Sequence, residues 1–204
     1  MSAGSSHRVG IFGGSFDPPH QAHVQLAQAA MSSWNLAKLW VFPTPRPSHR
    51  EGPKTDFSHR LKMTELAFQD MASVQVSDLE AIRPGPSYTI DTVEAVLAQD
   101  EKAELFLLVG ADQAEVFDTW HRWQDILSLC RLVVWARPDS GPPAQALVQW
   151  HNDRQMALQF LALPPTDLSS TQLRAQIRHS PHIHPNGISP AVWHYLQSHH
   201  LYRN

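Results

Sequence analysis

Short apolar runs rich in β-branched and aromatic residues alternate along this chain with longer segments in which apolar residues recur at helical spacing. Such alternation is typical of strands joined by helices, and a crossover through a helix makes consecutive strands parallel. Strands that are apolar on both faces must be covered on both sides. The sequence therefore predicts an α/β fold, with a doubly wound, mostly parallel sheet and helices on both of its faces.

The expected elements follow from these runs. Strands are predicted at residues 9–12, 39–42, 74–77, 105–109, 132–135 and 159–163, and helices at 23–34, 58–71, 89–99 and 124–129. In the second helix the apolar stripe is expected to contain Leu61, Leu66 and Phe68. A last helix is expected from Ser189, with Pro190 at its first position. Ligands of such sheets bind at the carboxyl ends of the strands, so the loops that follow strands are the places to look for a site.

Composition excludes several classes of protein. The chain has 204 residues, of which 42% are hydrophobic and 17% charged, enough apolar material for one core and unlike a disordered chain or a coiled coil. A net charge of -3 argues against non-specific nucleic-acid binding. There is no apolar run long enough to span a membrane and no signal peptide. We expect a cytoplasmic, soluble protein in which the single cysteine, Cys130, is a buried and inert thiol.

A glycine pair and two histidines stand where the first predicted strand turns into a helix. The string at residues 13–23 reads GGSFDPPHQAH. Gly13 and Gly14 let the backbone approach a ligand closely, and the start of the helix offers N–H groups and the positive end of its dipole. His20 and His23 are three residues apart, on one face of the first turn, where both can donate to phosphate oxygens. The string predicts an anion site.

Two other readings of this histidine pair remain open, a zinc pair or two solvated surface residues. Zinc is disfavoured because the loop supplies no Cys or Glu to complete four ligands. The chain has 13 histidines, whose protonation would reverse the sign of its formal net charge. We expect most of the others to be solvated surface residues rather than metal ligands.

A second helix start near the end of the chain also suits an anion. Residues 167–174 read DLSSTQLR. Ser169 or Ser170 is a natural N-cap, and Arg174 lies about one turn into the helix, so its guanidinium can reach an anion at the same N-terminus. Taken alone, the string is also what an ordinary capped surface helix would contain.

The first string resembles the GGSFDPPHxGH motif of the nicotinate mononucleotide adenylyltransferases, in the nucleotidylyltransferase superfamily whose HxGH motif contacts ATP phosphates. Ala22 replaces the glycine of HxGH, and its methyl could narrow the approach of the nucleotide to the backbone. Residues 169–174 are similar to the family's SSTxxR motif. Residues 87–92 are similar to its SYTIDT segment, residues 110–112 to its GAD turn, and residues 120–123 to its W-x-x-W pattern. The resemblance runs from about Val9 to Tyr202.

The basic, proline-rich loop at residues 43–53 adds a weaker match. His49 and Arg50 resemble the family's PHK or PHR element, although Ser48 replaces its proline. An alternative role for Asp112 is that of a helix N-cap, which involves no contact with a nucleotide. Trp120 is similar to the tryptophan that stacks on the nicotinate ring, whereas Trp123 is expected in the core.

The resemblance implies a Rossmann-like single domain over residues 9–204, after a flexible tail at residues 1–8. It also implies a reaction of NAD biosynthesis, in which AMP is transferred from ATP to nicotinate mononucleotide and the products are deamido-NAD and pyrophosphate. Mg²⁺ would arrive with ATP rather than in a metal site of the protein. The implied catalytic residues are His20, His23 and Arg174. The implied ATP-binding residues are Gly13, Gly14, Ser15, Phe16, His20, His23, Gly110, Asp112, Ser170, Thr171 and Arg174. The implied pyridine-nucleotide-binding residues are Asp17, His49, Arg50, Ser87, Tyr88, Thr89, Trp120 and His121.

Three alternatives stay open. The mononucleotide could carry an amide instead of a carboxylate, or the second substrate could be phosphopantetheine, although the segments at 87–92 and 120–123 argue against the latter. The protein could also be a non-catalytic nucleotide sensor that has kept the pocket. We expect neither nucleic acid nor a membrane among its partners, and homo-oligomerisation is left open.

Overall fold

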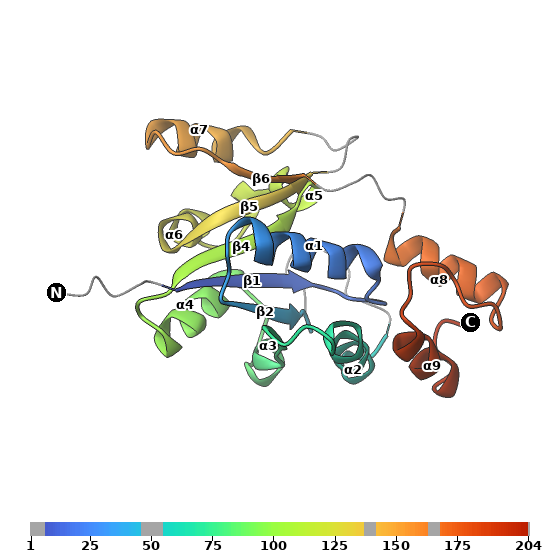
Figure 1. Cartoon of the computed structure of the whole chain (residues 1–204). Coiled ribbons are helices and arrows are strands. Elements are labelled where there is room, and N and C mark those ends of the chain that lie inside the picture. Colours follow the sequence, from blue (N-terminus) through green and yellow to red (C-terminus); the bar gives the residue numbers. More distant parts are fainter. Residues whose placement is uncertain (1–6, 46–54, 137–141, 163–167, 204) are drawn as a thin grey trace.

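Six strands form one parallel sheet in the computed structural model, which describes residues 7–45, 55–136, 142–162 and 168–203 (Figure 1). The strand order is β3-β2-β1-β4-β5-β6, and every neighbouring pair is parallel. The predicted fold class is confirmed, and the sheet is wholly rather than mostly parallel. The strands are β1 (Arg8–Gly14), β2 (Lys38–Pro43), β3 (Val74–Val76), β4 (Glu104–Gly110), β5 (Cys130–Ala136) and β6 (Gln159–Ala162).

The strand order reverses between β1 and β4, which lie side by side at the centre of the sheet. The chain first builds outward from β1 to β2 and β3, and then returns to the other side of β1 for β4, β5 and β6. In open α/β sheets this reversal leaves a crevice at the carboxyl ends of the two central strands, because the helices that follow them go to opposite faces. Residues after Gly14 and Gly110 therefore border the crevice.

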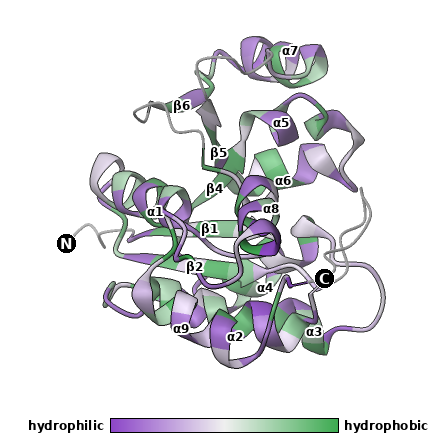
Figure 2. Ribbon diagram, turned by 90° about the vertical axis from the view of Figure 1, so that its right-hand side faces the viewer, coloured by the Kyte–Doolittle hydropathy of each residue, from purple (hydrophilic) through white to green (hydrophobic). Residues whose placement is uncertain are grey.

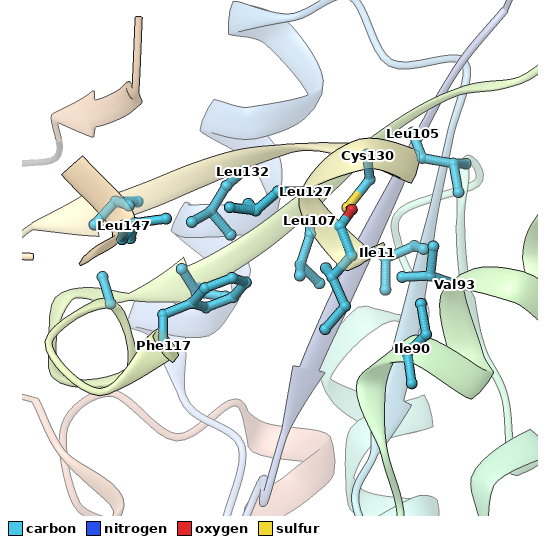
Figure 3. Close-up of a cluster of buried hydrophobic side chains, with 14 of the residues drawn as sticks. Ile11, Ile90, Val93, Leu105, Leu107, Phe117, Leu127, Cys130, Leu132 and Leu147 are labelled. Atoms are coloured by element: carbon cyan, nitrogen blue, oxygen red, sulfur yellow. The ribbon is translucent and has the colours of Figure 1, made fainter. Parts of the chain in front are cut away.

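Side chains of the central strands alternate between two apolar layers. In β4, Leu105 and Leu107 belong to one buried cluster, whereas Phe106 and Leu108 belong to the cluster on the opposite face. Figure 3 shows the first cluster, in which Leu105 and Leu107 lie among side chains from neighbouring strands and helices. Burial on both faces explains why these strands are continuous apolar runs in the sequence.

Helices cover both faces. The cluster around Phe106 includes residues of α1 and α2, and the cluster around Leu107 includes residues of α4, α6 and α7. The helices are α1 (Gln21–Ser33), α2 (Phe57–Phe68), α3 (Leu79–Ile82), α4 (Thr89–Gln99), α5 (Ala111–Ala114), α6 (Trp123–Leu129), α7 (Gln145–Asp153), α8 (Ser170–His179) and α9 (Pro190–Ser198), with a short 3-10 turn η1 (Phe117–Thr119).

Most predicted elements are present, with some corrections. The helices α3, α5 and α7 were not predicted, and β1 begins at Arg8, which had been assigned to the N-terminal tail. The apolar stripe of α2 was wrong, because of the three expected residues only Phe68 is buried, and the buried face instead runs through Arg60, Met63, Thr64 and Phe68. The charged Arg60 interrupts this buried face, so the apolar residues of the sequence alone indicated a different face of the helix.

Cys130 is buried, as predicted, at the start of β5. Burial raises the pKa of its thiol to about 12, and its Sγ donates to the carbonyl oxygen of Ile126 at 3.1 Å. The histidines are less uniformly solvated than expected, since His151 is buried and its Nδ1 lies 2.9 Å from the carbonyl oxygen of Leu147. None of the helices in the described ranges is long and apolar enough to cross a membrane.

The last two helices form a separate layer beyond the sheet. Leu173 and Ile177 of α8 and Val192 and Leu196 of α9 are buried together with Met63 of α2. Figures 1 and 2 place α8 beyond the carboxyl ends of the central strands, on the side where the crevice opens. The end of the chain is therefore brought next to the loop that follows β1.

Candidate active site

The loop between β1 and α1 leaves room for a ligand at Gly13. A Cβ at Gly13 would meet no described protein atom within 4 Å, whereas a Cβ at Gly14 would stand 3.0 Å from the ring of Phe16. Phe16 is 1% exposed and adopts a φ of 47°, in the left-handed region. The glycine pair therefore has two uses, an open approach at Gly13 and close packing at Gly14.

His20 and His23 are stacked against each other at the start of α1. Their ring centroids lie 3.8 Å apart with 30° between the planes. His20 is the N-cap in extended conformation rather than part of the first turn, and its backbone N–H donates to Nδ1 of His23 at 3.1 Å. This bond makes Nδ1 of His23 an acceptor, so in the neutral ring the proton is on Nε2. Nε2 is therefore the donor nitrogen of the neutral ring.

The free N–H groups expected at the start of α1 are only partly available. The N–H of Gln21 donates to the carbonyl oxygen of Gly187 at 2.7 Å, and the N–H of His23 donates to the carbonyl oxygen of His20 at 2.9 Å. Two donors of the first turn are thus engaged within the protein. The two imidazoles therefore carry more of the expected anion site than the helix end does.

α8 is fastened to the same loop by two of the predicted residues. Ser170 Oγ donates to the carbonyl oxygen of Pro18 at 2.8 Å, and Arg174 Nη1 donates to the carbonyl oxygen of Asp17 at 2.6 Å. Arg174 Nη2 also donates to Thr171 Oγ1 at 3.2 Å. The structure therefore brings the second predicted helix start next to the first. Ser169 is the N-cap of α8, and its hydroxyl accepts from the N–H of Gln172.

Asp17 is held by the end of the chain. Its carboxylate is 3% exposed, accepts from the Tyr202 hydroxyl at 2.6 Å, and lies 4.0 Å from Arg174 Nη1. Burial and the neighbouring Asp17 carboxylate raise the pKa of Tyr202, so the phenol stays protonated and remains a donor. In this arrangement Asp17 braces the loop. Sequence reasoning missed Tyr202, because nothing local in the sequence links it to a loop 185 positions earlier.

A cavity of about 190 Å³ opens at the carboxyl ends of β1 and β4, where the strand order reverses. In the described chain it is lined by residues of the strands β1, β2 and β4, of the helices α3, α4 and α5, and of the loops beside them. Among these, Glu80 and Gln113 add polar groups that were not predicted. Asp17, Tyr88 and His121 are not among its lining residues in the described part of the chain. The predicted residues that do line it are Gly13, Gly14, Ser87, Thr89, Gly110 and Trp120.

The other predicted residues of the described chain do not line this cavity, and two predicted residues lie outside the described ranges. Tyr88 stacks on His121 with ring centroids 4.5 Å apart, and Asp112 is exposed in the first turn of α5. Asp112 does not cap that helix, whose N-cap is Gly110. His49 and Arg50 lie outside the described residues, so their predicted role stays a prediction.

Ala22, the departure from the glycine of the motif, points into the protein. It is 1% exposed and belongs to the buried face of α1. Its methyl is therefore accommodated by packing, and the surface of the loop is not narrowed by it.

Glu80 places a buried carboxyl in the cavity wall. It is 8% exposed, and its Oε1 accepts from Thr92 Oγ1 at 2.9 Å, while Arg83 Nη2 donates to the same Thr92 oxygen at 2.6 Å. Burial raises the pKa of Glu80, an effect opposed by the Thr92 hydroxyl, the Arg83 charge and the Ser87 hydroxyl. A raised pKa means that the folded protein resists ionisation of this group.

We expect Glu80→Gln to stabilise the protein increasingly as the pH rises. Above about pH 4.5 the unfolded chain ionises Glu80 before the folded protein does, so the wild type loses about 1.4 kcal/mol for each unit by which folding raises the pKa. The loss levels off once the pH exceeds the folded pKa, and Gln avoids it while its amide oxygen can still accept from Thr92. Melting temperatures at pH 5 and pH 8 measure the effect. The exposed Glu115→Gln is the control, and an equal Glu80→Gln shift at both pH values would contradict the expectation.

Comparison with known proteins agrees with these features. Residues 11–176 match the family described as Cytidylyltransferase-like. The chain is 38% identical over 96% of its length to a probable nicotinate-nucleotide adenylyltransferase of Albidiferax ferrireducens, covering 98% of that protein, and 32% identical to one of Bacillus pumilus, covering 97% of this chain and 99% of that one. A Plasmodium falciparum nicotinic acid mononucleotide adenylyltransferase complexed with NaAD has a similar structure, with a TM-score of 0.75 and 18% identity over 96% of this chain and 97% of that one.

Proposed function

Because this chain belongs to the nicotinate-nucleotide adenylyltransferase family, we propose that it transfers the adenylyl group of ATP to nicotinate mononucleotide, releasing pyrophosphate and forming deamido-NAD for NAD biosynthesis. The observation that carries the proposal is the meeting of two anion-suited helix starts, α1 with its stacked histidines and α8 with Arg174, on one loop beside the central cavity.

The proposed reaction needs no covalent intermediate with the protein. A 5′-phosphate oxygen of nicotinate mononucleotide attacks the α-phosphorus of ATP, the new P–O bond forms, and the bond between that phosphorus and the oxygen bridging to the β-phosphate breaks. Pyrophosphate leaves with the electron pair. Catalysis then consists of positioning two phosphorylated substrates and offsetting negative charge as it moves toward the leaving group.

The anion-binding side chains are assigned from their donors. His23 Nε2 is the donor nitrogen of the neutral ring, because its Nδ1 accepts from the backbone, and the His20 ring lies against the ring of His23. The two imidazoles are therefore proposed to bind the α- and β-phosphates of ATP. Arg174, which lies one turn into α8, is proposed to bind the departing pyrophosphate together with Ser170 and Thr171.

The cavity is proposed to hold the pyridine nucleotide. Trp120 and Ser87 both line it, and Trp120 lies against Phe117 with ring centroids 4.8 Å apart, which fixes the indole. A fixed indole is a suitable surface on which an electron-poor pyridine ring can stack. Gly13 and Gly110 line the same cavity at the ends of the two central strands and are proposed to border the bound ATP.

Members of this family act on ATP, and a divalent metal, proposed to be Mg²⁺, is expected to accompany it. Within the described ranges, no three His, Cys, Asp or Glu side chains are grouped so that they could hold a metal ion. We propose that Mg²⁺ is held mainly by the phosphate oxygens of ATP, since this ion is usually bound through substrate phosphates rather than in a cage of protein ligands, and that the residues near those oxygens act on the phosphates directly.

Pyrophosphate release measured with paired substrates tests the proposal. We expect ATP and nicotinate mononucleotide to give turnover, with kcat/KM at least about tenfold higher than for nicotinamide mononucleotide. Phosphopantetheine, as a third acceptor, should give none.

Each alternative outcome of this assay points to a different function. A higher kcat/KM for nicotinamide mononucleotide would make the amide, rather than the carboxylate, form of the mononucleotide the substrate. Turnover with phosphopantetheine would contradict the proposal that the cavity holds a pyridine nucleotide. Binding of ATP in a calorimeter without turnover on any acceptor would leave the nucleotide sensor as the function.

A further inference from the structure

We propose that Arg60, a fully buried arginine of α2, is a positioning residue that fixes the backbone of the phosphate-binding loop through a fork of hydrogen bonds to three carbonyl groups. This inference rests on the proposed function in so far as the loop is taken to bind ATP. Arg60 itself touches no substrate in this scheme, because it is only 1% exposed.

The fork joins three separate stretches of chain. Arg60 Nη1 donates to the carbonyl oxygens of Ser15, at 2.8 Å, and Thr44, at 3.0 Å, and Nε donates to that of Thr55 at 3.0 Å. Ser15 belongs to the loop after β1, Thr44 follows β2, and Thr55 precedes α2. Ordinary helix packing needs none of these bonds, and a buried guanidinium carries a large desolvation cost, so the arrangement is better explained by the loop that it holds.

The bond to Ser15 sets the direction of the next donor in the loop. In a trans peptide the carbonyl group and the following N–H point in opposite directions, so a Ser15 carbonyl turned toward Arg60 turns the Phe16 N–H away from it. Phe16 has a φ of 47°, which is unfavourable for a side chain of this size and persists only where surrounding bonds hold it. Arg60 provides one of those bonds from beneath the loop.

The neighbouring bond strengthens the same arrangement. The N–H of Thr44 donates to the carbonyl oxygen of Gly14 at 2.8 Å, so the carbonyl groups of the consecutive residues Gly14 and Ser15 are both tied to the end of β2 or to α2. A carbonyl pointing at a phosphate would repel it. The bonds from Thr44 and Arg60 turn these two oxygens toward the protein, so N–H donors rather than carbonyl oxygens are left to face the ligand.

The charge of Arg60 also balances Asp17. Burial lowers the pKa of Arg60, whereas the negative charges of Asp17 and Asp56 raise it. Because an arginine stays protonated in proteins, Arg60 and Arg174 together surround the Asp17 carboxylate with positive charge. Loss of the fork can therefore be separated from loss of the charge by comparing Arg60→Lys with Arg60→Ala.

The experiment compares full-length Arg60→Ala, Arg60→Lys and the matched control Thr64→Val. Thr64 is buried on the same face of α2, and its hydroxyl donates to the carbonyl oxygen of Arg60 at 2.7 Å, so Thr64→Val perturbs the helix but leaves the fork intact. Melting temperature and circular dichroism establish that each variant is folded. Pyrophosphate release is then measured at varied ATP, with and without guanidinium at low millimolar concentration.

We expect kcat/KM for ATP to fall by about 10²-fold in Arg60→Ala, and by at least about tenfold in Arg60→Lys, whose single ammonium cannot span the three carbonyls. Thr64→Val should remain within about twofold of the wild type. Guanidinium, which can enter the space left by the side chain, should restore at least about tenfold of the activity of Arg60→Ala and should not affect Thr64→Val.

Three results would overturn the inference: a folded Arg60→Lys as active as the wild type, a loss in Thr64→Val equal to that in the arginine variants, or no recovery of Arg60→Ala with guanidinium. If Arg60→Ala does not fold, Arg60→Lys, which keeps the buried charge beside Asp17, carries the test. An inactive wild type would instead contradict the proposed function, and the Kd of ATP for Arg60→Lys against the wild type, measured by calorimetry, would still decide the inference.

Discussion

His20→Ala is expected to lower kcat for pyrophosphate release by about 10³-fold and to leave the fold intact. The physical reason is the loss of a positioned donor at the α- and β-phosphates, where charge accumulates as the reaction proceeds. The ring of His20 stacks on His23 at 3.8 Å, so its removal also frees the neighbouring imidazole to move. Single-turnover and steady-state pyrophosphate release measure the effect, and near-wild-type turnover would contradict the assignment.

His23 allows the chemical role to be separated from the structural one. Its Nδ1 accepts the N–H of His20, as a side chain three residues after an N-cap does in a capping box. Gln at this position can accept the same bond through its amide oxygen. His23→Gln is therefore expected to keep the melting temperature while losing activity like His20→Ala, because an amide cannot become a cation as an imidazole can. A role that needs only a neutral N–H donor, which the amide also has, would leave the variant active. His179→Ala, exposed at the end of α8, is the control for a histidine outside the site and should be unchanged.

Arg174→Ala is expected to lower kcat/KM for ATP by about 10² to 10³-fold, the size seen when a charged transition-state donor is removed. The guanidinium has two tasks, since it donates to the carbonyl oxygen of Asp17 and is proposed to bind pyrophosphate. Arg174→Lys keeps the charge but not the planar fork, so it should recover only part of the loss.

Arg178→Ala is the matched control, because Arg178 lies one turn further along α8 and is exposed. Rates of pyrophosphate release at varied ATP, together with the binding of inorganic pyrophosphate by calorimetry, test this prediction. Equal losses of activity in Arg174→Ala and Arg178→Ala would mean that only the overall positive charge of α8 matters. Unchanged activity in Arg174→Ala would mean that Arg174 does not belong to the active site.

The sequence predicts the sheet well because burial on both faces leaves a strong local signal. The run at β4 is apolar without interruption, and the helix at Thr89–Gln99 was predicted with the bounds that the structure has. α7 was missed because its segment mixes polar and apolar residues, although Leu147 and Trp150 are buried. Boundaries elsewhere differ by a few residues, since helix ends depend on capping contacts made by other parts of the chain.

The candidate site was predictable where a motif is contiguous and not where its supports are distant. His20, His23 and Arg174 could be named as candidates from the sequence because each lies in a short string at a predicted strand-to-helix turn, and their roles stay predictions. Arg60 and Tyr202 act through bonds to the loop after β1 from far along the chain, and tertiary contacts of this kind leave no periodic pattern. For Arg60 the sequence offers one signal, namely that this charged residue stands at helical spacing from Met63 and Thr64.

The fastening of the first loop by α8 and by Tyr202 has a consequence for biosynthesis. Ser170, Arg174 and Tyr202 contact Asp17 or Pro18 across separations of 152, 157 and 185 positions. A ribosome that has released the chain only through β6 has made every strand of the sheet but none of these contacts. Closing loops of such length is slow relative to local helix formation, so the nascent protein would acquire its sheet first and its competence for nucleotide chemistry last.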